Sequence, residues 1–199
     1  MRIQTLFPIP LGFFDLDPGI NQEELAFIAG LSQRANMGNR TSEDSYLMDR
    51  PELARLREFF KTSIDEYLQT IFAPKYDVEL RITQCWANYT NLGEFHHKHE
   101  HPNSIVSGVF YVQSDSTQDR IYFYRNKYQT IKLVTENFNP FNSDSWWFEA
   151  VPNSLVLFPS SLSHSVEAVK TTETRISISM NTFPVGKCGA KEELTELIL

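Results

Sequence analysis

All five histidines of the chain fall in two places, and this is the clearest chemical signal in the sequence. Four occur from His96 to His101, and the fifth is His164. His99 and His101 are two residues apart, so on a β-strand their side chains leave the same face. Two close imidazoles and a distant third suit divalent iron and leave further coordination positions open. We therefore expect His99, His101 and His164 to form a non-haem iron site.

Two neighbours of this run are alternative ligands. His97 has the parity of His99 and would bind the metal if the register of the strand were shifted. Glu100 would supply a carboxylate, but on a strand it points away from His99. We expect His96 and His97 to line the site or to lie in solvent, and Glu100 to lie at the surface.

The segment that begins at Arg175 alternates between polar and apolar residues, as a strand with two different faces does. The polar face carries Arg175, Ser177, Ser179 and Asn181. Polar groups inside a small barrel need partners, and a guanidinium beside a serine hydroxyl would hold a terminal carboxylate there. We therefore expect Arg175, assisted by Ser177, to bind a carboxylate-bearing cosubstrate. The alternative is an exposed strand on which Arg175 pairs with a surface acid.

The composition is that of a folded domain: 199 residues, of which 41% are hydrophobic and 22% are charged. The net charge of −7 argues against a nucleic-acid scaffold, although a small basic patch would still admit a nucleic-acid substrate. Cys85 and Cys188 give neither a disulfide framework nor a zinc spacing. No segment approaches the ~18 apolar residues of a membrane span. We expect one cytoplasmic domain over 1–199 with no membrane partner, and a homodimer stays open.

Two helices are expected before residue 78, over 22–34 and 51–72, with a polar loop at 35–48. Asn21 is placed to cap the first helix, and Pro51 suits the first turn of the second. From residue 78 onward the apolar period becomes that of strands. The expected strands are 80–89, 105–112, 121–125, 129–134, 146–150, 154–158, 165–169 and 175–183. About eight strands are the count of a jelly roll, and a short helix is expected in the tail at 189–199.

Several segments resemble the 2-oxoglutarate and iron(II)-dependent oxygenases related to prolyl 4-hydroxylases. They are Cys-Trp-Ala-Asn at 85–88, His-Glu-His-Pro-Asn-Ser at 99–104, Ser-Gly-Val-Phe-Tyr-Val at 107–112, and the segments 155–164, 175–181 and 6–10. The resemblance implies a mainly β (α+β) fold, a cupin-like double-stranded β-helix over about 78–184 with supporting helices over about 20–72. It also implies a dioxygenase that uses iron(II), 2-oxoglutarate and O2. Such an enzyme releases succinate and CO2 as it oxidises a substrate, and hydroxylation is the expected outcome.

Within this family interpretation, Tyr111 and Asn88 are expected to line the cosubstrate pocket, and no catalytic residue is expected beyond the metal ligands. The substrate stays open between a protein side chain and a small molecule. One departure from the wider superfamily concerns the metal. Where that superfamily has His-x-Asp, this chain has His99-Glu100-His101, so a third histidine replaces the carboxylate.

Two other functions compete with this interpretation. The first is a cupin-type metalloprotein that does not use 2-oxoglutarate, in which Arg175 would have no necessary role. The second is a metal-free jelly-roll binding module, which would leave the arrangement of the histidines unexplained.

Overall fold

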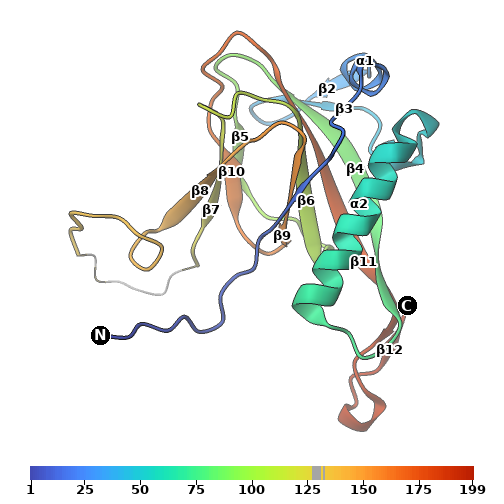
Figure 1. Ribbon diagram of the computed structural model, residues 1–199, viewed down its shortest axis with the longest axis vertical. Helices are drawn as coiled ribbons and strands as arrows, with labels where there is room; N and C mark the ends of the chain where they lie inside the picture. Colours follow the sequence, from blue (N-terminus) through green and yellow to red (C-terminus); the bar gives the residue numbers. More distant parts are fainter. Residues whose placement is uncertain (127–130, 132) are drawn as a thin grey trace.

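The computed structural model describes residues 1–126, 131 and 133–199, and its strands form two antiparallel sheets (Figure 1). The larger sheet contains β1 (Gly12–Asp15), β2 (Gln33–Ala35), β3 (Arg40–Ser42), β4 (Val78–Thr90), β6 (Val106–Gln113), β9 (Ser154–Pro159), β11 (Arg175–Cys188) and β12 (Leu197–Ile198). The smaller sheet contains β5 (His96–His99), β7 (Arg120–Tyr124), β8 (Ser145–Glu149) and β10 (His164–Val166).

The strand order brings together segments that are far apart in the sequence. Along the larger sheet it is β1-β9-β6-β11-β4-β3-β2, with β12 paired to β11, and along the smaller sheet it is β5-β10-β7-β8. Two facing antiparallel sheets connected in this way form a jelly roll. The predicted double-stranded β-helix with N-terminal helices is therefore confirmed.

The central strands β6 and β9 of the larger sheet are buried on both faces, and each divides its side chains between two hydrophobic clusters. Along β9, Leu155 and Leu157 belong to the cluster under the helices. Val156 and Phe158 belong to the cluster between the two sheets. This alternation follows from the two-residue period of a strand, and it separates the supporting helices from the interior of the β-helix.

Helix α1 (Gln22–Ala29) begins where the sequence predicts and ends earlier. The side chain of Asn21 accepts a hydrogen bond from the Glu24 N–H, and the Glu24 carboxylate accepts one from the Asn21 N–H, which closes a capping box. The helix stops at Gly30, and the last two residues predicted to continue it to 34, Gln33 and Arg34, belong to β2, which pairs with β3. The predicted loop at 35–48 therefore contains a β-hairpin.

The second predicted helix, 51–72, is confirmed in extent. It consists of the 3-10 turn η2 (Pro51–Leu53), helix α2 (Ala54–Tyr67) and the π-helical turn η3 (Leu68–Phe72), preceded by the 3-10 turn η1 (Leu47–Asp49). Figure 1 shows α2 lying along the outer face of the larger sheet. Its Phe60 ring meets Phe110 of β6 edge-on, with ring centroids 5.5 Å apart. This contact joins the helical layer to the sheet.

Other predicted boundaries differ from the structure. Of the predicted strand 129–134, residues 129, 130 and 132 lie outside the described residues, and the others carry no regular structure. The tail forms the 3-10 turn η4 (Lys191–Glu193) and β12 instead of a helix, because Leu197 pairs with Cys188. The short strands β2 and β3 had no counterpart in the prediction. The strand expected for the histidine run is β5, which ends at His99, so that His101 follows it.

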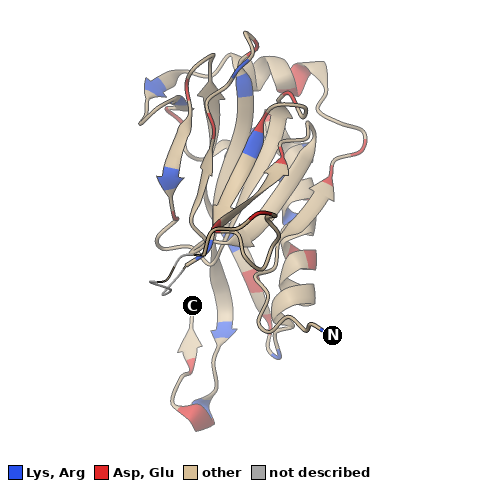
Figure 2. Ribbon diagram, turned by 90° about the vertical axis from the view of Figure 1, so that its left-hand side faces the viewer, with Lys and Arg blue, Asp and Glu red and all other residues tan. Residues whose placement is uncertain are grey.

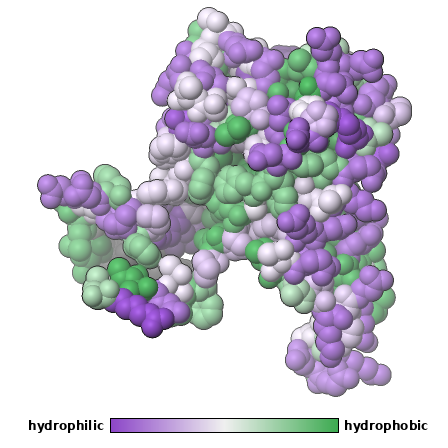
Figure 3. Space-filling model, viewed as in Figure 1, coloured by the Kyte–Doolittle hydropathy of each residue, from purple (hydrophilic) through white to green (hydrophobic). Residues whose placement is uncertain are grey.

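The surface carries charges of both signs. Figure 2 shows basic and acidic residues interspersed over the side of the molecule that it presents. Figure 3 shows hydrophobic residues gathered near the centre of another face, among polar ones. Within the described residues, no helix is long and apolar enough to cross a membrane.

Candidate metal centre

The structure brings together the three histidines that the spacing singled out. His99 ends β5 and His164 begins β10, and the two are paired in register. His101 follows β5, and its N–H donates to the Ser160 carbonyl at 3.0 Å. One ring nitrogen from each histidine lies within 4.8 Å of the others, and the Nε2 atoms of His101 and His164 are 3.3 Å apart. This is a suitable arrangement for three ligands on one side of a metal ion.

Backbone carbonyls orient two of the rings. Nδ1 of His99 lies 2.8 Å from the His97 carbonyl oxygen, and Nδ1 of His164 lies 3.0 Å from that of Leu162. A carbonyl accepts only from a protonated nitrogen, so these contacts assign the proton of each neutral ring to Nδ1. The lone pair of Nε2 is then left for a metal, as the outer hydrogen bonds of metal-binding histidines require.

Burial keeps the histidines in the form that binds metal. Burial, together with the neighbouring His99, lowers the pKa of His164 to about 2 and the pKa of His101 to about 4. Burial also lowers the pKa of His99, against the hydrogen bond to His97, which raises it. All three rings are therefore neutral at physiological pH, and a metal does not have to displace a proton from them.

A bulge in β5 changes which neighbouring histidine shares the face of His99. His164 pairs with His99 and Val166 pairs with His96, so two steps along β10 oppose three along β5. His96 consequently stacks on His99, with ring centroids 4.5 Å apart. His97 instead approaches the Met37 carbonyl, 3.4 Å from its Nδ1. The His97 ring is also near that of His99, with centroids 4.9 Å apart, and both His96 and His97 line the groove at the candidate centre, as expected; Glu100 is exposed as expected.

Arg175 lies at the start of β11 and is buried, with only 4% of its surface exposed. Its Nη1 is 2.9 Å from Oδ1 of Asp119, which is itself 5% exposed. The expected alternative, a surface pair, is thus wrong, because the acid is buried with the arginine. The second oxygen of Asp119 accepts from the Asp115 N–H at 2.9 Å. Asp119 is held in place by both contacts.

The other expected cosubstrate residues form a row across three adjacent strands. Ser177 of β11 pairs with Asn88 of β4 on one side and with Tyr111 of β6 on the other. Directly paired residues of a sheet project to the same face. The Asn88 amide donates to Ser179 Oγ at 2.9 Å and accepts from Trp86 Nε1 at 3.3 Å, so it is already engaged within the chain.

Tyr111 Oη is buried and has no hydrogen-bond partner among the described residues. A buried hydroxyl without a partner is costly, and a cosubstrate carboxylate beside Arg175 would supply the missing acceptor. The electrostatic influence of both Arg175 and Asp119 on the pKa of Tyr111 agrees with their being close. The residues present therefore fit a dicarboxylate.

Sequence reasoning missed Asp119. It ends the polar turn Asp115–Asp119, a pattern that indicates a surface loop. Its burial depends on Arg175, which lies 56 residues further along the chain. The one signal in the sequence was its position directly before the strand β7, where a side chain can turn into the interior.

A groove of about 450 Å³ leads to the histidines. The hairpin β2–β3 forms one wall with Arg34, Asn36 and Thr41, and β4 contributes Gln84 and Trp86. His96, His97, His99 and His101 form the wall at the metal side. The groove lining is mostly polar, and none of its lining residues is acidic.

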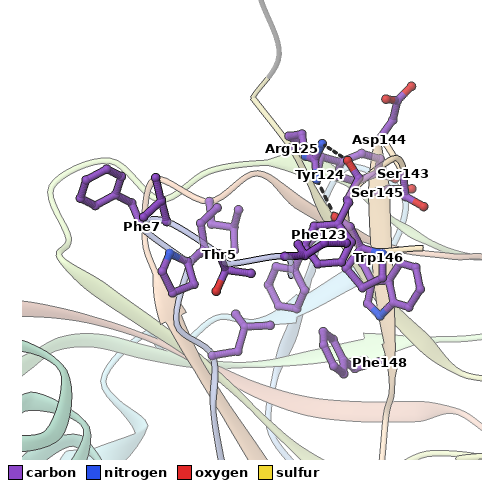
Figure 4. A pocket seen from close by; sticks show the side chains of 18 of the residues that line it. Thr5, Phe7, Phe123, Tyr124, Arg125, Ser143, Asp144, Ser145, Trp146 and Phe148 are labelled. Carbon is purple, nitrogen blue, oxygen red and sulfur yellow. Dashed lines mark hydrogen bonds between the residues drawn. The ribbon is translucent and has the colours of Figure 1, made fainter. Parts of the chain in front are cut away.

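A larger hollow of about 690 Å³ lies between the N-terminal segment and the strands β7 and β8 (Figure 4). Phe7 lies on one side, and Phe123, Trp146 and Phe148 lie on the other. Phe123 also contacts His164, with ring centroids 6.1 Å apart. None of the three clustered histidines lines this hollow, so we assign the chemistry to the smaller groove.

Solved structures of other proteins have a similar fold and support the jelly-roll assignment. An oxidoreductase of the 2OG-Fe(II) oxygenase family from Burkholderia pseudomallei is 14% identical, with a TM-score of 0.55 over 79% of this chain and 74% of that one. HygX from Streptomyces hygroscopicus, with nickel and 2-oxoglutarate bound, is 10% identical, with a TM-score of 0.59 over 87% and 82%. A prolyl hydroxylase from Trichoplax adhaerens, in complex with a peptide fragment, is 15% identical, with a TM-score of 0.57 over 87% and 83%.

Two further comparisons concern the sequence. The comparison with curated proteins gave no match. Residues 84–181, which run from β4 into β11 and include every residue of the candidate centre, match the family model described as "Putative 2OG-Fe(II) oxygenase". On this fold, the match over these residues indicates a 2-oxoglutarate and iron(II)-dependent oxygenase, which uses iron(II), 2-oxoglutarate and dioxygen.

Proposed function

We propose that His99, His101 and His164 hold iron(II) in this oxygenase. The observation that carries the proposal is the approach of three neutral ring nitrogens to within 4.8 Å of one another. Bound iron(II) with 2-oxoglutarate supplies the activation of dioxygen that oxidises a substrate and releases succinate and CO2. The role of the chain is to orient these groups and to keep water from them.

Arg175 is proposed to hold the distal carboxylate of 2-oxoglutarate. Its guanidinium is buried, and Ser177 and Tyr111 lie on the same face of the larger sheet. Tyr111 would donate to the carboxylate from its otherwise unpartnered hydroxyl. A charge-assisted pair of this kind is directional as well as strong.

The groove under the β2–β3 hairpin is proposed to admit the primary substrate. Its amide and hydroxyl side chains and the single indole of Trp86 favour a polar ligand, either a protein side chain or a small molecule. Structural neighbours give examples of both kinds: the Trichoplax enzyme carries a peptide, and a HygX structure carries hygromycin B. The two free cysteines, Cys85 and Cys188, support the proposal of a reducing cytoplasmic environment.

The test of the metal site is an anaerobic titration of the purified protein with iron(II), with and without 2-oxoglutarate. We expect one iron per chain, and loss of most bound iron in each of His99→Ala, His101→Ala and His164→Ala. His97→Ala is the matched control and should bind iron as the parent does. Iron binding by His164→Ala as tight as that of the parent would refute the assignment.

The test of the cosubstrate site is the same titration on Arg175→Ala and Arg175→Lys. Both should raise the 2-oxoglutarate requirement while leaving iron binding nearly intact, since lysine offers a point charge and not a fork of donors. Loss of iron and cosubstrate together would indicate that Arg175 is structural. If 2-oxoglutarate does not change the affinity of the parent protein for iron(II), the cupin-type alternative is favoured.

A further inference from the structure

We infer that Asp119 sets the affinity of the site for 2-oxoglutarate, by occupying part of the arginine that the cosubstrate carboxylate also needs. This inference rests on the proposed role of Arg175. In the structure the guanidinium already has a carboxylate partner, Asp119 Oδ1, at 2.9 Å. The incoming carboxylate must therefore share or displace a partner that belongs to the chain.

The contacts of Arg175 show what is left for a ligand. Nη1 donates to Asp119, and it also lies 3.4 Å from the Glu167 carbonyl oxygen. Nη2 reaches the same carbonyl only at 3.5 Å, a long and weak contact. The Nη2 side of the guanidinium is therefore less committed than the Nη1 side. A carboxylate that binds there meets an arginine whose charge is already compensated.

Burial strengthens the charge interaction between Arg175 and Asp119. Arg175 and Asp119 are 4% and 5% exposed, so solvent screens their interaction little. An arginine between two buried carboxylates is a net negative cluster, which is less favourable than an arginine with one. Asp119 thus stabilises the metal-free fold and at the same time opposes the binding of an anion.

Asp119 also balances the charge of the whole centre. Three neutral histidines leave an iron(II) ion at +2, where a carboxylate ligand would leave +1. Arg175 adds one positive charge and Asp119 removes it, so a 2-oxoglutarate dianion brings the sum to zero. The wider superfamily has an aspartate at the position of His101. In this chain Asp119, beside Arg175, supplies that negative charge instead.

The variant that isolates this effect is Asp119→Asn, because an asparagine oxygen can still accept from Arg175 while the negative charge is gone. We expect anaerobic binding of 2-oxoglutarate to the iron-loaded variant to tighten by about tenfold or more. The metal-free variant should melt at a lower temperature, since its buried guanidinium has lost its counterion. Iron and 2-oxoglutarate together should then raise its Tm by more than they raise that of the parent.

The control is Glu167→Gln, which removes the same charge from a residue whose backbone contacts Arg175 and whose side chain is exposed. It should leave 2-oxoglutarate binding unchanged, because solvent screens that charge. The double variant His101→Asp/Asp119→Asn restores the parental charge sum. It should bind 2-oxoglutarate more tightly than His101→Asp alone.

A measurement on the parent protein does not depend on the folding of any variant. It compares the binding of 2-oxoglutarate with that of 2-oxopentanoate, which has the same carbon chain without the distal carboxylate. Because Asp119 already neutralises the charge of Arg175, the parent should prefer 2-oxoglutarate by no more than about a hundredfold, and Asp119→Asn should widen the preference.

The outcomes separate two failures. Weaker or unchanged 2-oxoglutarate binding in Asp119→Asn, or a parental preference above about a hundredfold, would overturn the role of Asp119 alone. Unchanged 2-oxoglutarate binding in Arg175→Ala would overturn the proposed cosubstrate site, and the role of Asp119 with it.

Discussion

Tyr111 has a buried hydroxyl with no partner among the described residues, and this makes its substitution informative. Burial raises the pKa of Tyr111, so the hydroxyl stays protonated and donates. Tyr111→Phe removes an unsatisfied polar group, so the metal-free protein should be as stable as the parent or slightly more stable. If the hydroxyl donates to the cosubstrate, the Kd for 2-oxoglutarate should rise by about 10- to 100-fold, the value of a hydrogen bond to a charged group.

Anaerobic titration and urea unfolding of the same Tyr111→Phe sample check both parts. Loss of stability with unchanged 2-oxoglutarate binding would mean that the hydroxyl has a structural partner and does not face the cosubstrate. Asn88→Ala offers a contrast. Because the Asn88 amide is bonded to Ser179 and Trp86, its removal should cost stability.

The buried histidines predict an acid-sensitive metal-free protein. The folded-state pKa values of His164, about 2, and His101, about 4, lie below the ordinary value of 6.5. Below pH 6.5 the unfolded chain therefore binds protons that the folded protein does not, and the free energy of unfolding falls as the pH falls. Urea unfolding between about pH 7 and about pH 5 should show this loss. His164→Gln should make the dependence shallower, and an equal slope in both proteins would contradict the account.

The sequence was sufficient to predict which three histidine side chains lie close together, and the reason is local geometry. His99 and His101 are two residues apart, and His164 lies on the strand that pairs with β5. One residue escaped prediction because its position is set by the tertiary structure. Asp119 is buried beside Arg175, which lies 56 residues further along the chain.

At the scale of elements, the length of a helix or strand determines whether it can be predicted from the sequence. Helix α2 was predictable because several turns repeat the same apolar face, and α1 had a capping box at its start. Strands such as β2 and β3 span only three residues, too few to establish a period of two. Their pairing partners, and not their own residues, define them.

The β2–β3 hairpin closes over the groove through its turn, and Gly38 is required there. Gly38 has a φ of +88°, and its carbonyl accepts from the Phe95 N–H at 2.9 Å. A Cβ at this position would lie 2.7 Å from the Phe95 carbonyl oxygen. Gly38→Ala should therefore cost more than the about 1–2 kcal/mol of left-handed backbone alone, and it should detach the hairpin from the segment before β5.

Gly93→Ala is the matched control for the hairpin. Gly93 has a φ of +79°, and a Cβ there would meet nothing within 4 Å, so it carries the backbone strain without the clash. Hydrogen exchange of the Phe95 amide should accelerate in Gly38→Ala and much less in Gly93→Ala. Equal effects in both variants would show that the hairpin is not held by this contact.

At the scale of the whole molecule, the larger sheet separates the layer of helices from the layer that contains the candidate metal centre. The helices pack on one face, and the smaller sheet with the histidines packs on the other. The same substitution can therefore be made on both sides. Phe60 of α2 and Phe158 of β9 are both fully buried, and the Phe158 ring lies 4.7 Å from that of His164.

Phe60→Leu and Phe158→Leu should each lower the free energy of unfolding by about 1–3 kcal/mol, because both leave a cavity in a packed core. Their effects on the metal should differ. Phe158 supports the ring of a proposed ligand, so its loss should weaken iron binding by about tenfold, as changes around metal ligands do. Phe60 contacts the opposite face, so its loss should leave the iron affinity of the folded protein unchanged.

Urea unfolding of the metal-free variants and anaerobic iron titration of the folded ones separate the two effects. Equal loss of iron affinity in both variants would mean that the sheet transmits the disturbance, and that the helical layer helps to shape the metal centre.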